Sequence, residues 1–89
     1  MVEAIEIVFT EEFKRIYKKL PEQIKKKFEK QLRFLVSNPK HPSLKIHKLN
    51  GDWEFYVDIR YRCFFQRSHN KFVLLNIGSH KIVDRYKIT

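Results

Sequence analysis

The stretch TEEFKRIYKKLPEQIKKKFEKQLRFLVSN, residues 10–38, predicts two helices separated by a proline. Thr10 is a good N-cap, and Glu11 and Glu12 follow in the first turn, where the helix dipole favours acidic side chains. Pro21 ends the first helix and suits the first turn of the second. Apolar residues recur at helical spacing on both sides of the proline: Phe13, Ile16, Tyr17 and Leu20 before it, and Ile24, Phe28, Leu32 and Leu35 after it. The short link predicts an antiparallel helical hairpin.

The segments on both sides of this helix pair are predicted to be strands. Residues 2–9 are apolar on both faces, which favours a central position in a sheet. Residues 53–59 alternate between apolar and polar side chains, and a tight turn is expected within 58–61, because one uninterrupted strand through residue 66 would be unusually long. The nearly all-apolar residues 72–77 predict a second central strand, which Gly78 breaks.

The remaining segments are predicted to be loops. Residues 41–50 form a basic loop that ends in the strong turn signal Asn50-Gly51, and residues 67–71 connect two strands. The order β-α-α-β-β-β predicts an α+β fold, in which the two-helix hairpin packs on one face of a small, mainly antiparallel four-stranded sheet. The opposite face is expected to stay open and to carry basic side chains. The length predicts a single domain over residues 1–89.

The charge balance narrows the class of partner. Nineteen Lys and Arg oppose ten Asp and Glu, which gives a net charge of +9 and a pI near 9.9. This excess favours phosphate-bearing partners or an acidic protein surface, and plain solubility is the alternative explanation. The one cysteine, Cys63, excludes an internal disulfide and is expected to be a small core residue. With no signal-peptide pattern and no long apolar run, a cytoplasmic protein without a membrane span is expected.

The residue inventory limits the chemistry. The chain lacks a glycine-rich phosphate loop and a CxxC pair, and its four histidines have no metal-ligand spacing, so no metal and no cofactor are expected. Cleavage of RNA without a metal needs a base for the 2′-hydroxyl, an acid for the leaving 5′-oxygen and cations for the charge on phosphorus oxygens. Histidine suits the proton transfers, and arginine suits the phosphate.

Five residues are candidates for this chemistry. His80 follows the exit of the strand that Gly78 ends, and His47 lies in the basic loop; each is otherwise a surface histidine. Arg60 and Arg62 flank the suspected turn, where they face a scissile phosphate or simply remain as solvated strand-edge charges. Tyr86 can stack on a base or assist proton transfer, or it anchors the C-terminal tail to the core. His41 and His69 are expected to be ordinary surface residues.

Three short motifs, taken in order, carry a family resemblance. They are His47-Lys-Leu-Asn-Gly51 followed by Trp53, Tyr61-Arg62-Cys-Phe-Phe65, and Asn76-Ile-Gly-Ser-His80 with Asp84 and Tyr86. With the order of helices and strands, they make nearly the whole chain resemble the RelE/ParE toxin superfamily of bacteria and archaea. The resemblance implies an endoribonuclease that cuts mRNA in the ribosomal A site. It also implies a cognate acidic antitoxin, with which the toxin forms a hetero-oligomer.

The resemblance assigns roles to individual residues. Arg62 matches the arginine that contacts the scissile phosphate, and His47 matches the catalytic histidine of one subgroup. His80 stands where members have histidine or arginine, and Tyr86 matches a C-terminal aromatic that contacts substrate. The residues expected to bind RNA beside this site are basic: Lys45, Lys48, Arg60, Lys81 and Arg85.

The chain also departs from the family pattern. Tyr56 and Asp58 stand where some members carry paired lysines, and an acid there either orients a histidine or marks a weaker site. ParE-like relatives share the fold but poison DNA gyrase without RNase activity. A gyrase-directed toxin and an inactive RNA-binding remnant therefore remain as alternatives to the mRNA endonuclease.

Overall fold

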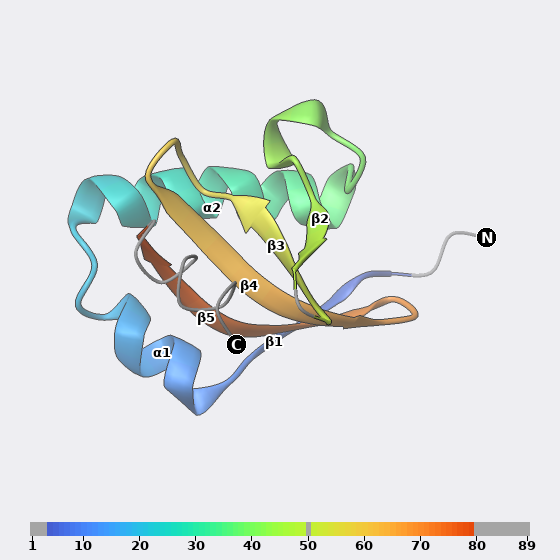
Figure 1. Ribbon diagram of the computed structural model, residues 1–89, viewed down its shortest axis with the longest axis horizontal. Coiled ribbons are helices and arrows are strands. Elements are labelled where there is room, and N and C mark those ends of the chain that lie inside the picture. The colour runs from blue at the N-terminus through green and yellow to red at the C-terminus, as the bar shows by residue number, and fades with distance from the viewer. Residues whose placement is uncertain (1–3, 50, 80–89) are drawn as a thin grey trace.

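A five-stranded sheet and two helices make up the part of the chain that the computed structural model describes, residues 4–49 and 51–79 (Figure 1). The elements are β1 (Glu6–Phe9), α1 (Glu11–Tyr17), α2 (Glu22–Ser37), the 3₁₀ turn η1 (Pro42–Leu44), β2 (His47–Leu49), β3 (Asp52–Tyr56), β4 (Tyr61–Ser68) and β5 (Lys71–Ser79). The strand order is β1-β5-β4-β3-β2, with β1 parallel to β5 and the other neighbours antiparallel. The predicted α+β class is confirmed, with five strands in place of four.

The fifth strand, β2, lies where a loop was predicted. Residues 47–49 pair antiparallel with residues 54–52, so that Leu49 faces Asp52 across a two-residue connection. Gly51 in this connection has a φ of 86°, a value that glycine adopts without strain. Three residues are too few to show a period-of-two pattern, which is why the turn was visible in the sequence and the strand before it was not.

The prediction that the first strand is central is wrong. β1 pairs only with β5 and forms one edge of the described sheet. Ile5 and Ile7 pack against the core, but on the other face Ala4 is exposed and Val8 is only half-buried. The strand was predicted to be covered on both faces because Ala4 and Val8 are apolar, but Ala4 is small and Val8 stands alone on that face. The prediction that residues 72–77 form a central strand is confirmed, because β5 lies between β1 and β4.

The first helix is shorter than its apolar spacing suggested. It ends at Tyr17, and residues 18–20 form a turn before Pro21, which is the N-cap of α2. Thr10 caps α1 as predicted: its Oγ1 accepts a hydrogen bond from the Phe13 amide at 3.1 Å. The Phe13 and Tyr17 rings lie 5.4 and 5.3 Å from the ring of Phe28, so aromatic contacts join the two helices.

One face of the sheet and both helices enclose the hydrophobic core. Its buried side chains are Phe13, Ile24, Phe28, Leu35, Leu44, Phe55, Val57, Cys63, Phe65, Phe72, Leu74 and Ile77. Leu32, predicted to belong to the buried stripe of α2, is only half-buried, and Gln31 is buried in that stripe instead. Its Nε2 donates to the carbonyls of Ser43 and Tyr56 at 3.1 and 2.8 Å. β2 pairs with β3 only as far as Glu54, so it does not reach the Tyr56 carbonyl. Gln31 supplies the hydrogen bond to that carbonyl instead.

Replacing Gln31 with alanine is expected to lower the free energy of unfolding by about 1–3 kcal/mol, because it leaves the Tyr56 carbonyl without its donor in a buried site. Urea unfolding followed by circular dichroism measures the change. The matched control is Gln23→Ala on the exposed side of the same helix, which should shift the midpoint little. Equal shifts for the two variants would contradict a buried structural role for Gln31.

The β4–β5 hairpin is tighter and longer than predicted. Ser68 faces Lys71, which leaves a two-residue connection in place of the expected loop 67–71, and His69 in it has a φ of 59°. A bulge follows, because Phe64 faces Asn76 while Phe65 faces Leu74. The extra residue lets both Leu74 and Ile77 face the core.

Gly78 does not break the last strand, contrary to the prediction. It pairs with Arg62, and β5 continues to Ser79. A glycine keeps both backbone hydrogen-bonding groups, so it weakens a strand without ending it. Its lack of a side chain also means that only backbone lies directly opposite Arg62.

The tight turn predicted between β3 and β4 is confirmed, and Asp58 organises it. Its Oδ1 accepts from the amides of Arg60 and Tyr61, both at 2.8 Å, and its Oδ2 faces Lys27 Nζ at 3.2 Å. Burial raises the pKa of this carboxyl, but the two backbone bonds and Lys27 outweigh that effect and hold the pKa below its ordinary value. The role of Asp58 among the described residues is therefore to fix the turn.

The lowered pKa of Asp58 predicts acid sensitivity. A carboxyl whose folded pKa is depressed adds stability above its unfolded pKa, about 3.9, and loses it as the pH falls through the folded value. We expect Asp58→Asn, which keeps an acceptor oxygen but no charge, to show a smaller loss of melting temperature than the unsubstituted protein below about pH 4. Thermal unfolding between pH 2 and pH 7 tests this. Parallel curves for both proteins would contradict it.

Candidate active site

Four side chains from β2, β3 and β4 gather on the face of the sheet opposite the core. The strand register places His47 beside Glu54 and Tyr56 beside Arg62. Successive residues of a strand alternate between the two faces, so Glu54 and Tyr56 lie on the face opposite the core residues Phe55 and Val57. This cluster of His47, Glu54, Tyr56 and Arg62 is the candidate active site.

His47 and Glu54 form the central contact. His47 Nε2 lies 2.8 Å from Glu54 Oε1, and His47 Nδ1 lies 2.9 Å from the carbonyl oxygen of Lys45. Both neighbours are acceptors, so each ring nitrogen faces an oxygen to which an N–H can donate. The His47 side chain is 51% exposed, whereas that of Glu54 is 4% exposed. An accessible proton donor is thus held by a buried carboxylate.

Arg62 is the member of the cluster that comes from β4. Its Nη1 donates to the carbonyls of Asp58, Ile59 and Tyr61 at 2.7, 3.1 and 3.2 Å. Its Nε lies 4.0 Å from Glu54 Oε1, and its Cζ lies 3.5 Å from the centre of the Tyr56 ring. The planar guanidinium therefore stacks on an aromatic face and also closes the 58–61 turn.

The face that carries the cluster is less open than predicted. Arg62 is 5% exposed, Glu54 3% and Phe64 0%. Glu54 Oε2 is buried, and among the described residues it has no hydrogen-bond partner. A buried carboxylate oxygen without a donor is energetically unfavourable, so Glu54 depends on His47 and Arg62 for compensation.

Lys45 adds an exposed positive charge next to the cluster. Its Nζ lies 4.8 Å from the centre of the Tyr56 ring, so Tyr56 contacts cations from both β4 and the segment before β2. Lys45 also has left-handed backbone angles, φ 46° and ψ 47°. That conformation is uncommon for a residue with a side chain, and it points the Lys45 carbonyl at His47 Nδ1.

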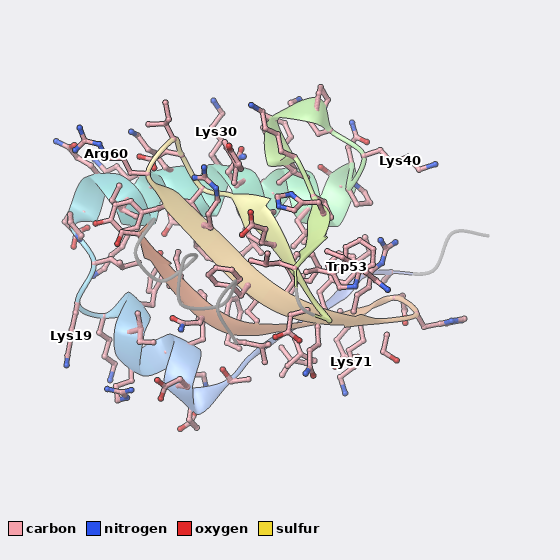
Figure 2. All side chains as sticks on the ribbon, viewed as in Figure 1. Lys19, Lys30, Lys40, Trp53, Arg60 and Lys71 are labelled. Atoms are coloured by element: carbon pink, nitrogen blue, oxygen red, sulfur yellow. The ribbon has the colours of Figure 1, made fainter. Side chains whose placement is uncertain are left out.

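Among the described residues, two further predicted site residues, Lys48 and Arg60, do not belong to this cluster. Lys48 faces the opposite side of β2, where its Nζ lies 5.4 Å from the Trp53 ring. Arg60 is exposed in the 58–61 turn, and its side chain points outward from that turn (Figure 2). The remaining four predicted residues lie outside the described part of the chain: His80, Lys81, Arg85 and Tyr86.

Two residues that were given no catalytic role in the sequence analysis, His41 and Cys63, have structural roles. His41 stacks on Phe34 with ring centres 3.8 Å apart, and its Nδ1 accepts from the Ser43 amide to cap η1. Cys63 is fully buried, and burial raises the pKa of its thiol well above the ordinary value, which makes it unreactive.

Residues 4–49 and 51–79 offer neither a metal site nor a membrane-spanning helix. Among these residues, no three His, Cys, Asp or Glu side chains lie close enough together to hold a metal ion. None of the helices in the same ranges has the length and apolar character needed to span a membrane.

Glu54 and Tyr56 are the members of the cluster whose roles could not be assigned from the sequence. Glu54 looked like one of the polar residues of an alternating strand. The signal that identifies it is the two-residue connection at 50–51, because pairing across that turn sets His47 against Glu54. Reading β2 as a loop concealed this contact.

The fold is that of the RelE/ParE toxins. The chain superposes on YafQ from E. coli strain BL21(DE3) with a TM-score of 0.73 and 15% identity, covering 89% of this chain and 97% of that one. It superposes on the archaeal RelE–RelB complex from Pyrococcus horikoshii OT3 with a TM-score of 0.72 and 13% identity, covering 86% and 96%. For the YoeB/ParE toxin from Agrobacterium tumefaciens the TM-score is 0.67 at 15% identity, with 85% and 99% covered. No family model and no curated protein sequence matches the chain.

Proposed function

We propose that this protein is the toxin of a type II toxin–antitoxin pair and that it cleaves mRNA on the ribosome without a metal ion. The observation that carries the proposal is the contact between half-exposed His47 and buried Glu54, 2.8 Å apart, on the sheet face that also holds Arg62. The fold shared with the toxins YafQ and RelE supports it. The net charge of +9 favours a polyanionic substrate.

His47 acts as a general acid or base in this proposal. The hydrogen bond between Nε2 and Glu54 persists when substrate binds, because a charge-assisted hydrogen bond to a carboxylate is stronger than one to a carbonyl. Nδ1 is then the nitrogen that exchanges the Lys45 carbonyl for an oxygen of the substrate. In its doubly protonated form the ring is ready to donate a proton to the leaving 5′-oxygen.

The charges around His47 complete the assignment. Arg62 supplies a fixed positive charge at the base of the cluster, where it favours the negative charge that develops on the phosphorus oxygens. Lys45 is exposed and supplies a cation to the substrate backbone. His80 and Tyr86 keep the acid/base and substrate-contact roles that the family resemblance implies. Attack by the 2′-hydroxyl leaves a 2′,3′-cyclic phosphate on one fragment and a 5′-hydroxyl on the other.

An antitoxin partner follows from the same proposal. Solved neighbours include a DinJ–YafQ toxin–antitoxin complex and an RelE–RelB complex. The excess of basic residues favours an acidic antitoxin that neutralises the charge and forms a hetero-oligomer with the toxin. Both proteins would act in the cytoplasm, where ribosomes are.

Induction in a bacterial host tests the proposed function against its alternatives. Rates of translation and DNA replication are followed after induction of this chain and of a His47→Ala control. We expect translation to stop first and only with the unsubstituted chain. Replication that stops first would indicate a gyrase-directed toxin. Unaffected growth, with the folded chain present, would indicate an inactive RNA-binding remnant.

A further inference from the structure

A pocket next to the candidate active site has no role in the chemistry described above. Its volume is about 410 Å³, which is within the range of small-ligand sites. It lies between α2, the residues around η1, and the end of β3 with the 58–61 turn. Figure 2 shows Lys30 reaching from α2 into the region between that turn and the η1 segment.

The pocket combines a basic rim with an apolar wall. Lys27, Lys30 and Lys45 line it, and Asp58 is its one acidic group among the described residues. Asp58 is already engaged by two backbone amides and by Lys27, so the charges of Lys30 and Lys45 are not neutralised there. Val57 and Ile59 form the wall, and Ile59 is 77% exposed.

The pocket continues directly from the cluster on the sheet. Tyr56 belongs to both, because it lines the pocket and the centre of its ring lies 3.5 Å from Arg62 Cζ. Lys45 also belongs to both: its carbonyl lies 2.9 Å from His47 Nδ1, its Nζ lies over the Tyr56 ring, and the residue lines the pocket. A strand of RNA held at His47 therefore has a path across Tyr56 to Lys30.

We propose that this pocket binds one unpaired nucleotide of the RNA substrate, next to the nucleotide that is cut. Lys30 and Lys45 contact its phosphate, and its base packs against Ile59 and the Tyr56 ring. This inference rests on the proposed function, since it extends the substrate path of the same site. An apolar wall with a cationic rim fits a nucleotide, because the base packs on the wall while the phosphate contacts the lysines. It fits an acidic peptide less well, because carboxylates gain nothing from an apolar surface.

Binding of a single-stranded RNA that is 2′-O-methylated throughout tests the proposal, because this probe lacks the attacking hydroxyl and cannot be cut. Fluorescence anisotropy is measured for Lys30→Ala and for Ile59→Ser. The control, Lys26→Ala, removes the same charge from an exposed position of α2 outside the pocket. One phosphate contact on a single strand contributes about −0.7 to the salt slope, which corresponds to roughly fivefold weaker binding at 0.1 M salt when it is lost.

We expect Lys30→Ala to weaken binding roughly fivefold and to lower the salt slope, while Lys26→Ala changes both much less. Ile59→Ser should weaken binding with the salt slope unchanged, because it removes only an apolar contact. Equal effects of Lys30→Ala and Lys26→Ala would overturn the proposal. So would a loss confined to an acidic peptide probe measured in parallel.

The same variants separate this inference from the proposed function. If Lys30→Ala weakens RNA binding but the unsubstituted protein cuts no RNA, the nucleotide pocket stands and the nuclease assignment fails. If the protein cuts RNA and Lys30→Ala binds the probe as well as Lys26→Ala does, the nuclease assignment stands and the pocket fails.

Discussion

Replacing His47 with alanine is expected to lower the rate of RNA cleavage by about 10²- to 10⁴-fold, because positioned proton transfer contributes that much to an enzymatic rate. The side chain is half-exposed and belongs to a short edge strand, so the fold should survive the change. The rate is measured on a defined mRNA under single-turnover conditions, with circular dichroism to establish folding.

Lys48→Ala is the matched control for this prediction. Lys48 is the next residue of the same strand, but it faces the Trp53 side of the sheet. Its loss should change the cleavage rate only through overall charge. A folded His47→Ala protein that cuts RNA at the rate of Lys48→Ala would remove His47 from the mechanism.

Replacing Arg62 with alanine is expected to lower the free energy of unfolding by about 3–5 kcal/mol, because it leaves a buried carboxylate with one partner fewer. Three backbone carbonyls of the 58–61 turn also lose their donor. A chain of 89 residues has a total stability of about 4–13 kcal/mol, so the loss is a large part of the whole. Chemical unfolding of the variant measures it.

These contacts change what an inactive Arg62→Ala protein would mean. A residue that only contacted the scissile phosphate would lower the rate on substitution and leave the fold intact. Glu54→Gln in the Arg62→Ala background provides the control, because a neutral amide needs no cation and should recover part of the stability. An Arg62→Ala protein as stable as the unsubstituted chain would contradict the structural role. A folded and fully toxic one would also remove Arg62 from the catalytic mechanism.

The fold was largely predictable because its signals are local. The helices follow from the N-cap Thr10, from Pro21, and from the helical spacing of apolar residues on both sides of that proline. The strand β3 follows from the alternation of apolar and polar residues. The errors arose where short elements or tertiary contacts decide the outcome. β2 is too short to show a pattern, and the edge position of β1 depends on which strand pairs with β5. The bulge that lets both Leu74 and Ile77 face the core is invisible in an all-apolar run.

The candidate site was predictable only in part for a related reason. His47 and Arg62 were named from residue type and family resemblance, but the contact that joins them depends on strand register. Glu54 becomes a site residue only when β2 pairs with β3 and sets it against His47. Asp58 was recognised as an acid near the site, yet its hydrogen bonds to Arg60 and Tyr61 show that it holds the turn.

Metal-free cleavage through the 2′-hydroxyl leaves characteristic ends on the RNA, so the termini of the fragments test the proposed reaction. Purified protein is incubated with a defined mRNA, free and on programmed ribosomes, and the termini of the fragments are identified. We expect a 2′,3′-cyclic phosphate and a 5′-hydroxyl at each cut, formed by the unsubstituted protein and not by His47→Ala. Fragments with 5′-phosphate ends, or an intact mRNA in both settings with folded protein, would contradict it.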